Sequence, residues 1–131
     1  MILFWRTFNL TNSFPFSHDE IRQDDGAHRS PTYDNIINAF RALVSETQAG
    51  DSCFFHYSGH GGRLRDEDGD EEDGYDETLI PVDYQSAGQI RDDVVYSELV
   101  GRMPEGSTLT CLMDCCHSGS VRKCDKCVWK E

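Results

Sequence analysis

The sequence predicts one α/β domain with a largely parallel β-sheet flanked by helices. A helix pattern and a strand pattern alternate twice along the 131 residues, and this order favours a parallel sheet. Both strand patterns carry bulky side chains at odd and even positions, which is typical of buried strands. A turn of small and polar residues follows each strand, where the ligands of parallel sheets gather.

The first helix is predicted to begin after Pro31 and to end at Gly50. Thr32 offers an N-cap, and Asp34 lies in the first turn, where the helix dipole favours an acid. Apolar residues then recur at helical spacing, namely Ile36, Ile37, Phe40, Leu43 and Val44. Residues 53–57 follow as a strand that we expect to be covered on both faces.

The second half of the chain repeats this order. Residues 78–83 predict a short strand near a sheet edge, because Pro81 cannot donate to a ladder. Ser97 is predicted to cap a short helix that ends at Gly106, and residues 108–113 predict a second buried strand. With the edge strand set aside, the two helices and the two buried strands give the predicted helix–strand–helix–strand pattern.

The charge of the chain is acidic and uneven. There are 24 Asp and Glu against 12 Lys and Arg, a net charge of −12, which argues against a nucleic-acid partner. Residues 66–77 hold nine acids and no base, so the remaining residues carry only 15 acids against 12 bases. The acidity is therefore predicted to belong to one loop.

Neither a membrane nor an oxidising compartment is indicated. No apolar run approaches the ~18–20 residues of a membrane span, and Arg6 interrupts the apolar start of the chain. Five of the six cysteines lie in the last 21 residues, unlike a disulfide framework spread over a secreted domain. We therefore expect a reducing location, cytoplasmic or nuclear, and take the cytoplasm as the prediction.

The two polar turns carry a candidate catalytic pair. His60 lies in the first turn, and Cys116 lies in the second turn, 56 residues later. A Cys nucleophile needs a neighbouring base, and His titrates near neutrality. Gly61 and Gly119 leave room for a substrate backbone, and amides at Gly61 and after Met113 could stabilise an oxyanion. The alternative is that these Cys and His residues only pack in the core.

Residues 56–61 (HYSGHG) and 114–119 (DCCHSG) resemble the two signature motifs of metacaspases, which are Cys peptidases of the caspase-like fold. The resemblance runs from about residue 32 to residue 120 and includes IPVD at 80–83. It implies that His60, rather than His56, is the catalytic His. It also implies that Cys116, rather than Cys115, is the nucleophile.

The same resemblance implies specificity and a cofactor. Asp114, with Ser58 nearby, matches the pocket for a basic P1 side chain, so cleavage is expected after Arg or Lys. Metacaspases of this type are commonly calcium-activated, and Asp76, Asp92 and Asp93 match the acids that bind calcium. A further family ligand follows the Cys motif. The next acid here is Asp125, so the fourth ligand stays open.

Two other metal sites remain as alternatives. In the acidic run, four acids sit at positions 1, 3, 5 and 12 of an EF-hand-like loop, namely Asp66, Asp68, Asp70 and Glu77. Glu71 replaces the required Gly, and a solvated insertion is the simpler interpretation. Cys124 and Cys127 could bind zinc with Cys115 or His117, form a redox pair, or belong to an unstructured tail.

The predicted organisation is an N-terminal segment (1–15), a catalytic domain (16–120) with an acidic insertion (66–77), and a Cys-containing tail (121–131). The family's first strand and helix and its small C-terminal region are not recognised, so the fold is expected to be incomplete. A complementing chain would supply the missing strand. Two functions follow. One is a calcium-dependent cysteine endopeptidase acting on Arg/Lys peptides. The other is an inactive or fragmentary module with a calcium-binding or regulatory role.

Overall fold

The computed structural model describes residues 2–9, 18–22, 29–65, 75–115 and 127–130, with side chains for 29–65 and 75–115. The strands are β1 (Ile2–Asn9), β2 (His18–Arg22), β3 (Asp51–Ser58), β4 (Gly61–Arg65), β5 (Tyr75–Leu79), β6 (Ile90–Arg91), β7 (Thr108–Asp114) and β8 (Cys127–Lys130). The helices are α1 (Tyr33–Glu46), α2 (Tyr84–Ala87), α3 (Asp92–Glu98) and the 3-10 helix η1 (Val100–Arg102). Within the described residues, no helix is long and apolar enough to cross a membrane.

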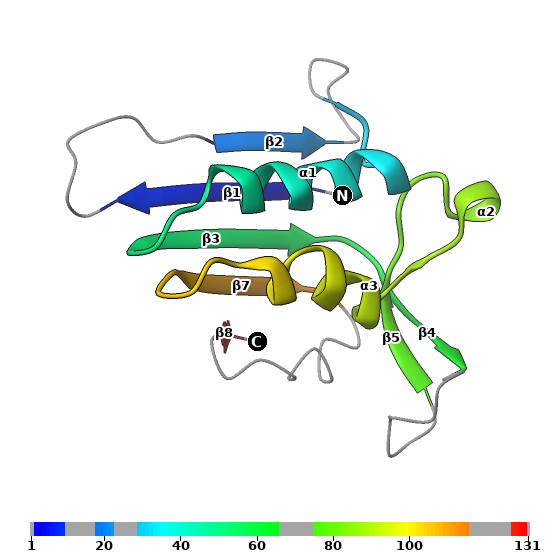
Figure 1. The fold of residues 1–131 in the computed structure, drawn as a ribbon. Coiled ribbons are helices and arrows are strands. Elements are labelled where there is room, and N and C mark those ends of the chain that lie inside the picture. Colours follow the sequence, from blue (N-terminus) through cyan, green and yellow to red (C-terminus); the bar gives the residue numbers. More distant parts are fainter. Residues whose placement is uncertain (1, 10–17, 23–28, 66–74, 116–126, 131) are drawn as a thin grey trace.

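The main sheet has the strand order β2-β1-β3-β7-β8, and a smaller sheet, β4-β5-β6, continues beyond the carboxyl end of β3 (Figure 1). The pairings β3–β7 and β7–β8 are parallel, which confirms the predicted parallel sheet. The pairings β1–β2 and β1–β3 are antiparallel and were not predicted. β1 lies within segment 1–15 and pairs along the whole of β3.

The first helix forms as predicted at its start but ends earlier. The Thr32 side chain accepts a hydrogen bond from the Asn35 amide, which satisfies one of the unpaired amides of the first turn. The helix ends at Glu46, and Gly50, with φ of 90°, turns the chain into β3. The buried face of α1 is formed by Ile36, Ile37, Ala39, Phe40 and Leu43.

The second helix differs from the prediction. Ser97 does not cap a helix that follows it; α3 starts at Asp92, and the Ser97 hydroxyl donates to the Val94 carbonyl inside it. Acids at the first two positions, Asp92 and Asp93, favour this start through the helix dipole. The predicted strand 78–83 is also shifted, because β5 covers Tyr75–Leu79 and ends before Pro81.

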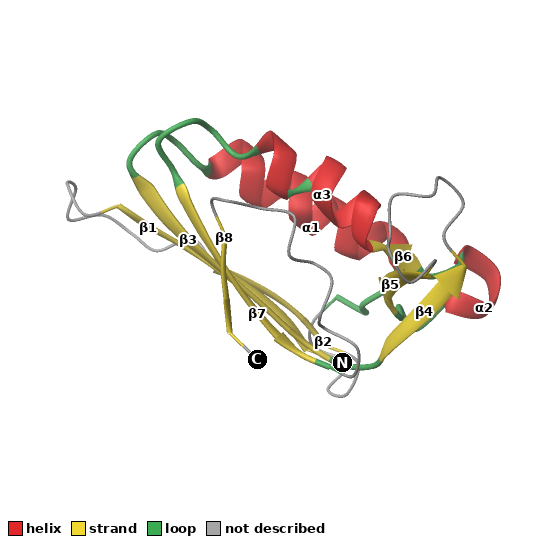
Figure 2. Cartoon of the chain, turned by 90° about the horizontal axis from the view of Figure 1, so that it is seen from below, coloured by secondary structure: helices red, strands yellow, loops and turns green. Residues whose placement is uncertain are grey.

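The helices α1 and α3 lie on one face of the main sheet (Figure 2), and the core lies between these helices and the sheet. Alternate β3 residues on this face are buried, whereas those on the other face are half-buried. The predicted cover of both faces is therefore complete on the core face and partial on the other face. Phe40 of α1 and Phe55 of β3 meet edge to face, with ring centroids 5.4 Å apart. Cys53 and Cys111 are also buried in this core.

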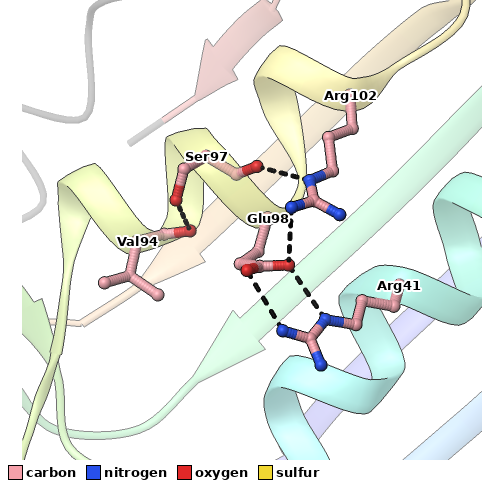
Figure 3. A network of polar contacts seen from close by, with 5 residues as sticks. All are labelled: Arg41, Val94, Ser97, Glu98 and Arg102. Carbon is pink, nitrogen blue, oxygen red and sulfur yellow. Dashed lines mark hydrogen bonds and ion pairs between the residues drawn. The ribbon is translucent and has the colours of Figure 1, made fainter.

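An ion-pair network joins the two helices outside the core (Figure 3). The Glu98 carboxylate accepts from Arg41 Nε at 2.9 Å and from the second Arg41 nitrogen at 3.1 Å. Arg102 approaches the same carboxylate at 3.6 Å. The hydrogen bonds from Arg41 hold the pKa of Glu98 below its ordinary value.

Replacement of Glu98 by Gln should therefore reduce stability in a pH-dependent way. A carboxyl whose folded-state pKa is lowered contributes stability above its unfolded pKa and loses that contribution as pH falls through the folded pKa. The melting temperature of E98Q should fall below that of the parent near pH 7, and the two should converge under acidic conditions. Thermal unfolding by circular dichroism measures this, with exposed Glu105→Gln as the control. An equal loss at all pH values would contradict the ion-pair explanation.

Tyr57 of β3 should make the fold sensitive to alkali. Its side chain is fully buried, and desolvation raises its pKa to about 12. Between pH 10 and 12 the folded state keeps a proton that the unfolded state loses, so stability falls as pH rises. A pKa raised by two units corresponds to a loss of about 2–3 kcal/mol in the free energy of unfolding.

Urea unfolding should show that the free energy of unfolding falls between pH 10 and 12 in the parent and in the control Tyr96→Phe, which changes an exposed tyrosine. The loss should be absent in Tyr57→Phe. Parallel pH curves for the parent and Tyr57→Phe would disprove the assignment to Tyr57.

Candidate active site

The parallel pairing of β3 and β7 brings the two polar turns together. Ser58 is paired opposite Asp114 at the carboxyl ends of the strands. The Ser58 hydroxyl donates to Asp114 Oδ2 at 3.3 Å, and the Gly59 amide donates to the Asp114 carbonyl at 3.3 Å. The expectation that both turns lie at one edge of the sheet is confirmed for these residues.

A cavity of about 470 Å³ opens at this edge. It is lined by Ser58, Gly59, His60, Ile80, Pro81, Val82, Tyr84 and Asp114. Three of the predicted site residues, His60, Ser58 and Asp114, therefore share one cavity. The predicted nucleophile, Cys116, lies outside the described residues, two positions after Asp114.

The two residues rejected as catalytic have other surroundings. Cys115 is half-buried and packs against the hydrophobic core. His56 is half-buried on β3 and is not among the residues that line the cavity. Neither residue lines the described cavity, which includes His60, while Cys116 lies outside the described residues.

The apolar wall of the cavity is tied to the start of α1. The Val82 amide donates to the Pro31 carbonyl at 3.0 Å, and Asp83 Oδ1 accepts from the Tyr33 amide at 2.8 Å. Residues 80–83 were predicted as part of an edge strand and matched the family resemblance, but neither Val82 nor Tyr84 was predicted at the site. Such a wall depends on contacts between segments 50 residues apart, which local patterns do not encode.

None of the glycines in the first turn has a positive φ; the described glycines with positive φ are Gly50, Gly88 and Gly106. Gly62 is closely packed by side chains of this chain, because an added Cβ would lie 2.7 Å from Gln89 Oε1 and 2.9 Å from Thr78 Oγ1. Gly61, a predicted oxyanion donor, is half-buried and begins β4 directly after His60.

Tyr57 is a site feature that the sequence analysis missed. Its hydroxyl donates to the His60 carbonyl at 2.7 Å and accepts from the Ile80 amide at 3.3 Å. The Ile80 amide also lies 3.2 Å from the His60 carbonyl. Tyr57 thus contacts two segments that line the cavity. In the sequence it is one bulky residue among several in a strand, and nothing local marks its hydroxyl.

The three predicted calcium ligands come together beside the small sheet. One carboxylate oxygen from each of Asp76, Asp92 and Asp93 lies within 4.8 Å of the others. Asp76 and Asp92 are buried, and Asp76 Oδ1 has no hydrogen-bond partner among the described residues. A buried carboxylate oxygen without a partner is costly. Hard oxygen donors around such an atom are chemically suited to calcium.

Arg91 supplies positive charge to this acidic cluster. Its guanidinium contacts Asp76 Oδ2 and also donates to the Arg65 carbonyl at 3.0 Å. A cation bound at Asp76 would therefore compete with Arg91 for the same carboxylate. The cluster holds three acids against this one arginine contact, so its local charge still favours a cation.

The rival metal sites fare differently. The EF-hand-like interpretation is wrong, because strands β4 and β5 flank the acidic run and Glu77 is a buried β5 residue that pairs with Arg63. Residues 75–77 thus belong to β5 rather than to one acidic loop, while 66–74 lie outside the described residues. Of the residues in the zinc alternative, His117 and Cys124 also lie outside the described residues, whereas Cys127 begins β8.

Comparison with known proteins shows what the chain is similar to. Residues 2–125 match the family described as metacaspase, peptidase C14 domain. Metacaspase III c of Phaeodactylum tricornutum is 52% identical over 102 residues, which cover 77% of this chain and 30% of that protein. Metacaspase-1 of Schizosaccharomyces pombe is 56% identical over 91 residues, which cover 70% of this chain and 21% of that protein.

The chain is also similar to a solved structure. The crystal structure of a protein from Geobacter sulfurreducens aligns with a TM-score of 0.56 at 35% identity, over 70% of this chain and 32% of that one. The chain spans less than a third of the length of these proteins. Because the family match covers almost all of its residues, the chain belongs to the metacaspases, a family of cysteine endopeptidases with a caspase-like fold.

Proposed function

We propose that this chain carries the catalytic centre of a calcium-dependent cysteine endopeptidase that cleaves after Arg or Lys. The β3–β7 register is the main support, because it gives His60, Ser58 and Asp114 a common cavity. Cys116 follows Asp114 by two residues. Membership of the metacaspase family makes Cys116 the expected nucleophile.

In the proposed reaction, the Cys116 thiolate attacks the carbonyl carbon of the scissile bond and forms a C–S bond. The carbonyl electrons move to oxygen, where the amides of Gly61 and Cys116 donate hydrogen bonds. His60 gives its proton to the leaving amine as the C–N bond breaks. Water then attacks the thioester and gives a proton to His60, and breaking of the C–S bond restores the thiolate.

The preference for a basic P1 residue is supported by the polar side of the cavity. Asp114 is exposed, and its Oδ2 accepts from the Ser58 hydroxyl, which orients the carboxylate. A guanidinium can form two parallel hydrogen bonds with a carboxylate, and an ammonium can form one. An acidic P1 side chain would be repelled by the same group.

Calcium is proposed at Asp76, Asp92 and Asp93. Asp76 Oδ1 has no hydrogen-bond partner in the described part of the chain, and this supports a cation with oxygen ligands. When bound, calcium would supply positive charge that neutralises these acids and stabilises β5 against α3. Asp76 lies four residues before Ile80, which lines the cavity directly after the end of β5. A cation that fixes β5 would therefore also help to fix the position of Ile80.

The alternative is a calcium-binding module without peptidase activity. The acidic cluster favours it, because the cluster involves neither Cys116 nor His60 and would bind a cation whether or not peptide bonds are cleaved. The two proposals separate cleanly by experiment, since one requires turnover and the other requires only calcium binding.

The purified chain should hydrolyse a fluorogenic Arg-terminated peptide. Cys116→Ala should lower the rate of this hydrolysis by about a thousandfold or more, because the nucleophile is lost. Release of the fluorophore in millimolar calcium measures this. An Asp-terminated peptide should be cleaved far more slowly.

Cys115→Ala is the matched control, because it removes the adjacent thiol and should retain activity. Activity that survives in Cys116→Ala but not in Cys115→Ala would reverse the assignment of the nucleophile. Absence of turnover in folded parent protein would favour the calcium-binding module.

Calcium should bind through the acidic cluster, and Asp76→Asn should weaken binding by about tenfold or more because one charged ligand is lost. Isothermal titration calorimetry and the calcium-induced rise in melting temperature both report it. Magnesium should bind more weakly, since it requires a smaller octahedral site. Asp34→Asn makes the same change in net charge at an exposed position of α1, and this variant should bind calcium like the parent. Equal weakening by both variants would indicate a general charge effect and no defined site.

A further inference from the structure

The imidazole of His60 stands in an unusual position for a group that must transfer a proton. It is exposed, and among the described side chains none hydrogen-bonds to it. In many cysteine and serine peptidases a third side chain orients the histidine. Here the described restraint on His60 acts on its main chain.

That restraint comes from the Tyr57 hydroxyl, together with the Ile80 amide, which donates to the His60 carbonyl at 3.2 Å. The Tyr57 side chain is fully buried, so its ring is fixed by packing, and its hydroxyl reaches the His60 carbonyl at 2.7 Å. The same hydroxyl accepts from the Ile80 amide at 3.3 Å. One oxygen therefore links the His60 turn to the Ile80 segment, which also lines the cavity. The turn itself has glycines on both sides of His60, which lower its own rigidity.

We propose that Tyr57 is a positioning residue for His60, with its hydroxyl holding the His60 main chain against the Ile80 wall of the substrate cavity. This inference rests on the proposed peptidase function. It adds a role that neither motif chemistry nor the calcium cluster supplies. Tyr57 acts through His60 and does not itself contact the reacting atoms.

Tyr57→Phe isolates the hydroxyl from the ring. The phenyl ring retains the packing against the core, and the His60 carbonyl keeps the Ile80 amide as a donor at 3.2 Å. No buried carbonyl or amide is therefore left without a partner, and the variant should fold. What it loses is the contact that fixes the turn to the interior of β3.

We expect kcat of Tyr57→Phe to fall by about tenfold or more, with KM changed by less than about twofold, because small displacements of catalytic groups lower the rate of chemistry. Rates are expressed per active site, counted by titration with an irreversible Arg-based inhibitor. Tyr33→Phe is the control, since Tyr33 is half-buried and its hydroxyl has no hydrogen bond among the described residues.

A merely structural role predicts a different result, namely fewer titratable sites with an unchanged kcat at each of them. That outcome would overturn the inference. The NMR signals of the His60 imidazole, assigned with His60→Gln, give a reading that needs no turnover. They should shift or broaden in Tyr57→Phe and remain unchanged in Tyr33→Phe.

The two proposals fail separately. If the parent chain shows no turnover, the proposed function fails, and the imidazole signals alone decide on Tyr57. Unchanged signals in Tyr57→Phe would then refute the positioning role. Normal turnover in the parent together with normal kcat in Tyr57→Phe would refute the positioning role and leave the peptidase function standing.

Discussion

The parallel register of β3 on β7 is the constraint on which the rest of the structure depends. Side chains alternate across a strand, so a slip of one residue would exchange the buried and half-buried faces of β3. In the observed register, Phe55 and Tyr57 face the core beside Cys111 and Met113 of β7. The same register sets Ser58 opposite Asp114. Core packing and site assembly are therefore satisfied by one strand pairing.

The second sheet connects the acidic cluster to the cavity through a single strand. β5 carries Asp76 in its ladder with β4, and the chain leaves β5 directly into the Ile80 wall. Asp92 and Asp93 approach the same strand from the start of α3, whose last residue is held by Arg41 of α1. A cation at the acidic cluster and a substrate in the cavity would thus act on opposite ends of one short segment.

The sequence predicted the elements whose signals are local. The cap and apolar spacing of α1, the two buried strands and the two polar turns can all be read within a few residues. β1 could not be predicted, because its apolar run gives no sign that it pairs with a strand more than 40 residues away. β5 was hidden by its acids, which are typical of loops but are buried here by ion pairing with Arg63 and Arg91. The proximity of His60 and Asp114 followed from the rule for parallel strands, whereas the role of Tyr57 required side-chain geometry.

The Tyr57 hydrogen bond reconciles two opposing requirements of the first motif, namely space for a peptide backbone and a fixed position for His60. Glycines beside His60 let a peptide backbone come close, yet they also allow the turn many conformations in solution. An anchor on the substrate side would block the cavity, so it must come from the interior. A tyrosine on the buried face of β3 meets this requirement, because its ring belongs to the core and only its hydroxyl emerges at the turn. Burial also keeps that hydroxyl protonated well above neutral pH, with a pKa of about 12, so it remains a hydrogen-bond donor wherever the His60–Cys116 pair could operate.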